Sequence, residues 1–323
     1  MIDAVVTSMG HSQALPAVSV ILPVYNAERY LADAVESILG QTFADFEFLI
    51  VNDGSTDGSG AILDRYAAQD SRIRLWHRPN GGYLPALNFM LGEARAELVA
   101  RMDADDVAMP GRFERQVEAF AENADLVLVG GQIELIDAES RRIGVLAQPM
   151  THEEIDEFHL SGHTSVCHPM AMYRRDPVLR VGGYREELVL AEDLDLWLRL
   201  AEVGRLRNLP EVVLHYRVHD QSVSSQRQSA QADAARRGCA EAWRRRGVEG
   251  RYHCEFFNER ATAGPDARFS TSLKYGWMAW KHGYRATARH YAGQAIRLRP
   301  FDERSLRLAA CVMLKRSPAG TRS

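Results

Sequence analysis

The sequence lacks any long hydrophobic run. Its longest apolar stretches include Leu126–Val129 and Leu308–Leu314, whereas a membrane-spanning helix needs roughly 18 or more consecutive apolar residues. Residues 1–16 also lack a basic segment followed by an apolar one, which is the pattern of a secretory signal peptide. We therefore expect a chain that has no transmembrane helix and works in the cytoplasm.

Cysteine is scarce in this chain. The four cysteines are scattered, at Cys167, Cys239, Cys254 and Cys311, and they form no CxxC pair or other metal-ligand spacing. This distribution argues against a disulfide-stapled scaffold and against a structural zinc site. We expect free thiols in a reducing compartment.

Neither sign of charge dominates the chain as a whole. Its 39 Lys and Arg and 43 Asp and Glu give a net charge of −4 over 323 residues. Residues 281–323 contain ten Lys or Arg and only two acidic residues, Asp302 and Glu303, so an acidic body precedes a basic end. This balance argues against a nucleic-acid partner, while the basic end suits an anionic surface. With 46% hydrophobic residues, the chain is too apolar to be disordered as a whole.

The first two-thirds of the sequence alternates strand-like and helix-like segments. The expected strands are Val18–Leu22, Phe46–Val51, Ile73–His77 and Leu98–Met102, and helices are expected at Glu28–Leu39 and Leu84–Ala94. Such alternation predicts parallel strands joined by right-handed crossovers, which is the doubly wound α/β class. Ligands of such sheets bind beyond the carboxyl ends of the strands.

The pattern changes further along the chain. It turns mixed at 126–173, with strand-like segments at 126–136 and 170–173, and a helix near 190–203 and a last strand near 212–218 follow. After about residue 225 the sequence becomes helical in pattern and rich in Ala and Arg. We therefore expect an N-terminal tail at 1–16, an α/β domain at 17–225 and a helical, basic C-terminal extension at 226–323.

Two polar clusters follow expected strands. Asp103, Asp105 and Asp106 come directly after the fourth strand, and such crowded acids suit Mg²⁺ or Mn²⁺ bound together with substrate phosphates. The alternative is a solvated acidic loop that precedes the helix near Pro110. The other cluster, Asn52–Asp57, begins a segment whose Asp53, Ser55, Asp57, Gly58 and Asp64 match most of the calcium-loop pattern of an EF-hand. The segment follows a strand instead of a helix, so a nucleotide-binding turn is the better interpretation.

Six motifs, taken in order, resemble the inverting family-2 glycosyltransferases with the GT-A fold. They are Val18–Asn26, Val51–Asp57, Asn80–Asn88, Asp103–Asp106, Gly182–Tyr184 and Glu192–Arg199. The resemblance covers roughly residues 17–220. It implies a doubly wound, mixed and mainly parallel sheet flanked by helices, and transfer of a sugar from a nucleotide-diphosphate donor, in particular a UDP-sugar, to a hydroxyl of a glycan or lipid-linked acceptor.

The resemblance also implies roles on the donor side. The nucleotide-sugar site would be formed by Pro23, Tyr25, Asn26, Asp53, Asn80, Asp103, Asp105 and Arg217. Asp53 would accept a hydrogen bond from the base, Asp103 would lie toward the ribose, and Arg217 would bind the diphosphate. Asp105 and His219 would hold a divalent cation, Mn²⁺ or Mg²⁺; the alternative for His219 is a solvated side chain at a strand end.

On the acceptor side, the resemblance makes Asp193 the catalytic base. An inverting transfer needs one carboxylate to take the acceptor proton, while the metal stabilises the leaving diphosphate. Glu192 would bind the acceptor or place charge at a helix N-terminus, and His168 would lie on the acceptor side. The residues that follow Asp193 are expected to be structural, with a buried Trp197 and an Asp195–Arg199 ion pair.

The basic segment 296–316 allows two interpretations. It forms either a helix that contacts an anionic membrane surface or a helical cap on the catalytic domain. Two other functions are also considered. A sugar nucleotidyltransferase would carry a Gly- and Arg-rich loop with a Lys after the first strand, but Pro23–Glu28 stands there. A catalytically inactive glycan-binding or scaffold protein remains the main alternative. A dehydrogenase is disfavoured because no GxGxxG follows a strand.

Overall fold

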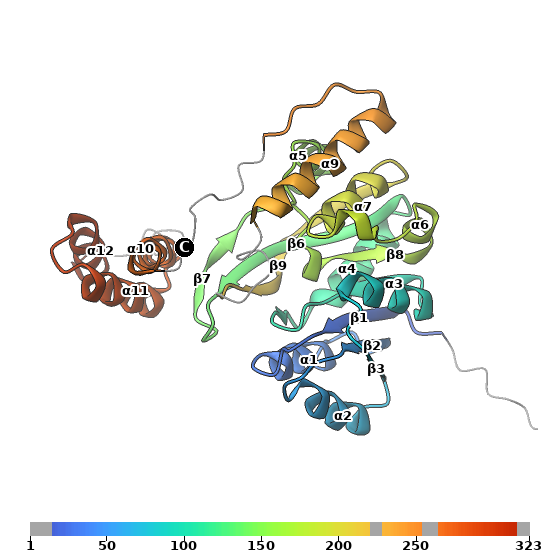
Figure 1. Ribbon diagram of the computed structural model, residues 1–323, viewed down its shortest axis with the longest axis horizontal. Coiled ribbons are helices and arrows are strands. Elements are labelled where there is room, and N and C mark those ends of the chain that lie inside the picture. Colours follow the sequence, from blue (N-terminus) through green and yellow to red (C-terminus); the bar gives the residue numbers. More distant parts are fainter. Residues whose placement is uncertain (1–14, 220–227, 254–263, 315–323) are drawn as a thin grey trace, which may run out of the picture.

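A computed structural model describes residues 15–219, 228–253 and 264–314. Its centre is a nine-stranded sheet (Figure 1). The strands are β1 (Val18–Val24), β2 (Phe46–Asp53), β3 (Ile73–Arg78), β4 (Leu98–Arg101), β5 (Val107–Ala108), β6 (Leu126–Ile136), β7 (Arg142–Leu146), β8 (Met172–Arg174) and β9 (Arg205–Arg217). Their order is β3-β2-β1-β4-β8-β6-β9-β5, and β7 pairs with β6.

The first half of the sheet is parallel. Strand β1 pairs in parallel with β2 and β4, and β2 pairs in parallel with β3. All eight residues of β2 are buried, as expected for a parallel strand covered on both faces. Antiparallel pairs join β8 to β4 and β6, while β6 and β9 run parallel. The carboxyl ends of β1, β2 and β4 therefore meet at one edge, and the expected mixed α/β class is confirmed.

Helices flank the sheet (Figure 1). In the first two-thirds they are α1 (Leu31–Leu39), α2 (Ser59–Gln69), α3 (Tyr83–Glu93), α4 (Arg112–Glu122), α5 (His152–Leu160), α6 (Arg175–Arg180) and α7 (Glu192–Leu200), with 3₁₀ turns η1 (His168–Met170) and η2 (Glu186–Leu188). The expected strands and helices are found here with shifts of a few residues at their ends, except that the last strand, β9, begins at Arg205 and not near residue 212. Helix α4 follows the acidic loop Asp103–Asp106, as expected.

The C-terminal part is helical, as predicted. It contains α9 (Gln228–Arg246), α10 (Pro265–Lys281), α11 (Arg285–Leu298) and α12 (Glu303–Leu314). Helix α9 shares a small apolar cluster with α7, whereas α10, α11 and α12 form a bundle around their own core beside β7 (Figure 1). The predicted domain boundary near residue 225 lies outside the described residues, as does most of the predicted tail at 1–16.

The structure also bears on the expected free thiols and on membrane-spanning helices. Cys167, Cys239 and Cys311 are free thiols, while Cys254 lies outside the described residues. Among the helices that the structure describes, none is both long enough and apolar enough to cross a membrane.

Candidate active site

A cleft of about 1310 Å³ lies at the sheet edge where β1, β2 and β4 end. Eleven of the residues predicted for the site line it: Pro23, Tyr25, Asn26, Asp53, Asn80, Asp103, Asp105, His168, Glu192, Asp193 and His219. The fold thus brings together residues that are up to about 200 positions apart, because the carboxyl ends of parallel strands share one edge. Arg217 is absent from the lining.

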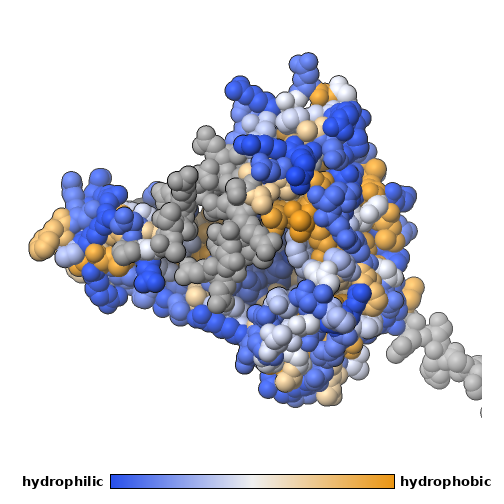
Figure 2. Space-filling view, viewed as in Figure 1, coloured by the Kyte–Doolittle hydropathy of each residue, from blue (hydrophilic) through white to orange (hydrophobic). Residues whose placement is uncertain are grey.

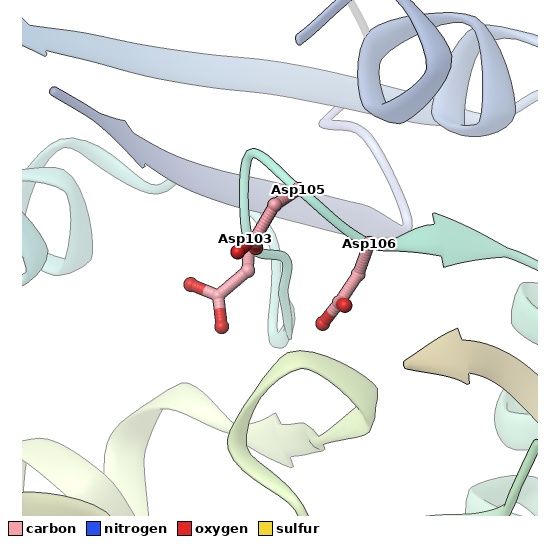
Figure 3. Close-up of side chains that lie close together, drawn as sticks. All are labelled: Asp103, Asp105 and Asp106. Carbon is pink, nitrogen blue, oxygen red and sulfur yellow. The ribbon is translucent and has the colours of Figure 1, made fainter. Parts of the chain in front are cut away.

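The acidic loop Asp103–Asp106 forms one part of the cleft, between β4 and β5 (Figure 3). Carboxylate oxygens of Asp103, Asp105 and Asp106 lie within 4.8 Å of one another. Burial, followed by the charges of Asp105 and Asp103, raises the pKa of Asp106 well above its ordinary value. Its Oδ1 accepts a hydrogen bond from the Arg217 backbone N–H at 2.7 Å, while its buried Oδ2 has no hydrogen-bond partner among the described residues.

This donor set fits a hard divalent cation. Three carboxylates held this close repel one another, and Mg²⁺ or Mn²⁺ prefers oxygen ligands of this kind. His219 lies beside the loop, with its Nε2 2.9 Å from Asp105 Oδ2. The residues that would hold the cation are therefore Asp103, Asp105 and Asp106, and His219, the other predicted ligand, adjoins Asp105.

Asp53 shapes the turn that carries Asn80. Its two carboxylate oxygens accept hydrogen bonds from the backbone N–H groups of Gly81 and Gly82, each at 2.9 Å. Gly82 has a φ of +90°, a conformation that glycine adopts without steric cost. Each carboxylate oxygen can accept a second hydrogen bond, so Asp53 can hold the turn and still serve a ligand in the cleft.

The loop after β1 is tied to the loop after β2. Asn26 has a φ of +49°, an uncommon left-handed conformation for a residue other than glycine. Its Oδ1 accepts a hydrogen bond from the Thr56 N–H at 2.8 Å, and its own N–H donates to Ser55 Oγ at 3.0 Å. Tyr25, just before it, is exposed in the cleft. These bonds fix the two loops that the sequence assigned to the nucleotide.

Glu192 and Asp193 begin helix α7 on another side of the cleft. The positive end of the helix dipole favours negative charge at this position. Burial raises the pKa of Asp193 to about 6. Burial and the neighbouring Asp193 charge raise the pKa of Glu192 to about 7. A carboxylate with a raised pKa in a cleft is a candidate general base.

Two side chains of the cleft engage Glu192. The Tyr83 hydroxyl donates to Glu192 Oε2 at 2.9 Å, and His168 Nδ1 lies 3.8 Å from Glu192 Oε1. His168 is buried, its Nε2 lies 2.9 Å from the Tyr184 hydroxyl, and burial holds its pKa well below the ordinary range. His168 thus adjoins Glu192, and its place on the acceptor side stays a prediction.

Arg101 and Tyr83 were missed by sequence reasoning. Arg101 is a buried cation at the end of β4 that forms an ion pair with Asp103 and lowers the pKa of Asp193 and of Glu192. Its positive charge therefore partly compensates the negative charge of the acidic groups on both sides of the cleft. Arg101 could have been identified from its position two residues before Asp103. Tyr83 could have been identified from its position directly after the Asn80–Gly82 turn.

The structure places Arg217 beneath the acidic loop and not in the cleft. The residue is 1% exposed, and its guanidinium donates to the Asp105 carbonyl at 2.7 Å and to Ser140 Oγ at 2.8 Å. It also lies over the Tyr30 ring, 4.4 Å from the centroid. The prediction that Arg217 binds the diphosphate directly needs correction, because all three guanidinium nitrogens are engaged inside the protein.

The structural interpretation of the residues after Asp193 is confirmed. Trp197 and Leu198 are fully buried. Asp195 and Arg199 form an i,i+4 ion pair with a nitrogen–oxygen distance of 2.6 Å. These residues fix α7, and hence the position of Asp193, without lining the cleft.

Comparisons with known proteins agree on a family. The model of the family described as "Glycosyl transferase family 2" matches residues 19–182. The O-antigen biosynthesis glycosyltransferase WbnJ of Escherichia coli is 35% identical over 212 residues, which cover 64% of this chain and 82% of that protein. The putative glycosyltransferase EpsE of Bacillus subtilis (strain 168) is 35% identical over 219 residues, 66% of this chain and 77% of that one.

Solved structures share the fold. S. aureus TarS 1–349 in complex with UDP-GlcNAc aligns with a TM-score of 0.57 at 19% identity, covering 91% of this chain and 90% of that one. The mannosyltransferase PcManGT from Pyrobaculum calidifontis, in complex with GDP-Man and Mn²⁺, aligns with a TM-score of 0.56 at 20% identity, covering 92% and 79%. The expected GT-A fold class is thereby confirmed.

Proposed function

This chain belongs to glycosyl transferase family 2 and is a glycosyltransferase; from that premise we propose that it performs an inverting transfer from a UDP-sugar to a hydroxyl of a glycan or lipid-linked acceptor. One observation carries the proposal. Asp193, a carboxylate with a raised pKa, lines the same cleft as the acidic loop Asp103–Asp106, whose clustered carboxylates suit a divalent cation. A base and a diphosphate site in one cleft are what an inverting transfer requires.

The proposed transfer is a single displacement that forms no covalent intermediate with the enzyme. The acceptor oxygen attacks the anomeric carbon and forms the new glycosidic bond, while the bond from that carbon to the diphosphate oxygen breaks. The acceptor proton moves to an Asp193 carboxylate oxygen, and the nucleoside diphosphate leaves. Glu192 is held by Tyr83 and adjoins His168, so we assign it to acceptor binding and leave the proton transfer to Asp193.

The donor is proposed to bind at the ends of β1, β2 and β4. Asp53, Tyr25, Asn26 and Asn80 would contact the nucleotide, with Asp103 toward the ribose. Asp103, Asp105, Asp106 and His219 would hold Mn²⁺ or Mg²⁺, which when bound supplies positive charge next to the leaving diphosphate. The UDP complexes of TarS and the GDP-Man and Mn²⁺ complex of PcManGT support this choice of donor class and cation.

Calorimetry tests the proposal against an inactive scaffold and a nucleotidyltransferase. We would titrate UDP, GDP, dTDP and CMP into the full chain with and without Mn²⁺. The proposal expects cation-dependent binding of a nucleoside diphosphate, above all UDP, and little effect of Mn²⁺ on CMP, which has a single phosphate. Absence of cation-dependent binding for every nucleotide would favour the scaffold alternative.

The pH dependence of transfer is a second test. Asp193 must be deprotonated to accept a proton, and its pKa is raised to about 6. The rate should therefore fall as the pH drops through 6, approaching tenfold for each further unit. The measurement is kcat/KM for the acceptor between about pH 5 and pH 8. The Asp193→Asn variant, which lacks this carboxyl, is the control, and a flat profile in the unsubstituted chain would contradict the assignment.

The outer end of the α10–α12 bundle exposes large apolar side chains (Figure 2). They are Phe301 (94% exposed), Leu306 (49%), Met313 (73%) and Leu314 (84%). Arg297, Arg304 and Arg307 are exposed in the same segment. Apolar side chains flanked by arginines are typical of a surface that contacts anionic lipid. We propose that this end of the chain contacts an anionic membrane, where a lipid-linked acceptor would be found.

Flotation with vesicles checks the membrane contact. The full chain should float with phosphatidylglycerol-containing vesicles and much less with phosphatidylcholine alone. Replacing Phe301, Leu306 and Met313 together by Ser should weaken binding at least about tenfold, because each buried apolar side chain contributes about 1.5–3 kcal/mol. The matched control replaces Leu179 and Val203, which are exposed elsewhere. Equal flotation of all variants would favour the helical-cap interpretation.

A further inference from the structure

The bundle α10–α12 reaches the catalytic domain through a buried hydrogen bond. The hydroxyl of Tyr291, on α11, donates to Asp137 Oδ2 at 2.7 Å, and both residues are buried. Burial and the Asp137 charge raise the pKa of the Tyr291 hydroxyl, so it is protonated and donates. A hydrogen bond to a charged, buried acceptor is among the stronger ones in proteins.

Asp137 holds the turn between β6 and β7. Its Oδ1 accepts hydrogen bonds from the N–H groups of Glu139 and Arg141 at 3.0 and 2.9 Å, and its Oδ2 also accepts from Arg141 Nε at 2.8 Å. Ser140, inside the turn, has a φ of +60°. That left-handed conformation is costly for serine and persists because the surrounding bonds impose it. The Tyr291 bond completes the set of donors around Asp137.

The β6–β7 turn also holds the side chain of Arg217. The Nη1 of Arg217 donates to Ser140 Oγ at 2.8 Å and to the Asp137 carbonyl at 3.3 Å. The Nε of the same guanidinium donates to the Asp105 carbonyl at 2.7 Å, and the Arg217 backbone N–H donates to Asp106 Oδ1 at 2.7 Å. A single buried residue therefore joins the β6–β7 turn to two of the three carboxylate residues of the acidic loop, to Asp105 through its side chain and to Asp106 through its backbone N–H.

We propose that Tyr291 is a positioning residue for the cation and nucleotide site, acting through Asp137 and Arg217 on the acidic loop. The bundle then sets the affinity of the donor site from a distance, although no residue of α10, α11 or α12 lines the cleft. The inference rests on the proposed function, because it assigns a cation to the acidic loop. Partners that orient metal ligands without touching the metal alter its affinity in this way.

Tyr284 provides a matched control at the same interface. Its hydroxyl donates to Glu134, on β6, as that of Tyr291 donates to Asp137. Glu134 in turn bonds to Arg142 at 2.7 Å and to His215 at 3.0 Å. Among the described residues, none of the hydrogen bonds of Glu134 reaches Arg217 or the acidic loop. Loss of either hydroxyl should loosen the bundle, but only loss of the Tyr291 hydroxyl should disturb the acidic loop.

The experiment compares Tyr291→Phe with Tyr284→Phe in the full chain. Calorimetry would measure Mn²⁺ affinity with and without UDP, and hydrogen–deuterium exchange would follow residues 103–107. We expect Tyr291→Phe to weaken Mn²⁺ binding about 3- to 10-fold, below the 10- to 100-fold range for direct partners of metal ligands. Exchange at 103–107 should increase. Tyr284→Phe should stay within about twofold of the original affinity with unchanged exchange at 103–107.

A double variant separates positioning from general destabilisation. In an Arg217→Lys background, Tyr291→Phe should have little further effect on Mn²⁺ affinity, because the hydrogen bonds that connect Asp137 to the acidic loop are already disrupted. Equal affinities and equal exchange in the two Tyr variants would overturn the inference. Failure of the unsubstituted chain to bind Mn²⁺ and UDP would instead contradict the proposed function, and exchange at 103–107 would still report whether Tyr291 positions the loop.

Discussion

Replacing Asp193 with Asn should lower the transfer rate about 100- to 10,000-fold while nucleotide affinity changes by no more than about twofold. General base catalysis contributes a factor in that range, and Asn cannot accept the acceptor proton. Asn has the same shape as Asp, and Asp193 is no part of the acidic loop that would hold the cation. The measurements are initial rates at saturating donor and calorimetric UDP affinity in Mn²⁺.

A variant of the neighbouring carboxyl makes this result specific. Glu192→Gln keeps the Tyr83 contact possible and should lose less activity than Asp193→Asn, since Glu192 is assigned to acceptor binding. Its main effect should be a higher KM for the acceptor. The reverse order of the two variants would show that Glu192 is the base.

Stability provides a further check on Asp193. Its pKa is about 6 in the folded chain and roughly 3.9 in an unfolded one. A raised pKa means that the carboxyl contributes stability below about pH 4 that is lost as the pH rises through 6. Asn carries no charge at any of these pH values. Asp193→Asn should therefore have an equal or higher Tm at pH 8, so that loss of activity cannot be attributed to unfolding.

Replacing Asp105 with Ala should remove most of the cation-dependent component of nucleotide binding, with a loss of at least about 100-fold. Changes to groups that merely orient a metal ligand cost 10- to 100-fold, so loss of a ligand itself should cost more. The cation would also lose the group that adjoins His219 Nε2 at 2.9 Å. The measurement is UDP affinity with and without Mn²⁺ for both chains.

The residual binding in Asp105→Ala is informative. The nucleotide contacts proposed at Asp53 and the Asn80–Gly82 turn do not involve the cation, so weak binding without Mn²⁺ should be the same in both chains. Glu118→Ala, an exposed acid on α4, is the control for a general change in charge and should bind UDP normally. Unchanged Mn²⁺ dependence in Asp105→Ala would show that the cation is held elsewhere.

The sequence alone determined the parts that depend on local pattern. Continuous apolar runs located β1, β2 and β4, and the predicted segment at 126–136 coincides with β6. Parallel strands buried on both faces give such runs because every side chain is covered. The polar residues that follow these strands then had to meet at one edge, which explains why the predicted donor-side residues at the ends of β1, β2 and β4 line one cleft, whereas Glu192 and Asp193 reach it from the start of α7.

The tertiary structure decided what depends on burial and on distant partners. Arg217 stands in a motif that the sequence assigned to the donor, yet its side chain lies under the acidic loop, bonded to residues 77 and 112 positions away. Arg101 and Tyr83 acquire their roles only from the carboxylates that the fold brings to them.

The contact of Tyr291 with Asp137 spans 154 positions and has no local signature. Periodicity and motifs report on neighbours along the chain, whereas desolvation and hydrogen bonding depend on neighbours in space. For this reason the sequence identified the class of enzyme and most of the cleft, and the structure alone decided which predicted side chains line the cleft and which, like Arg217, lie behind it.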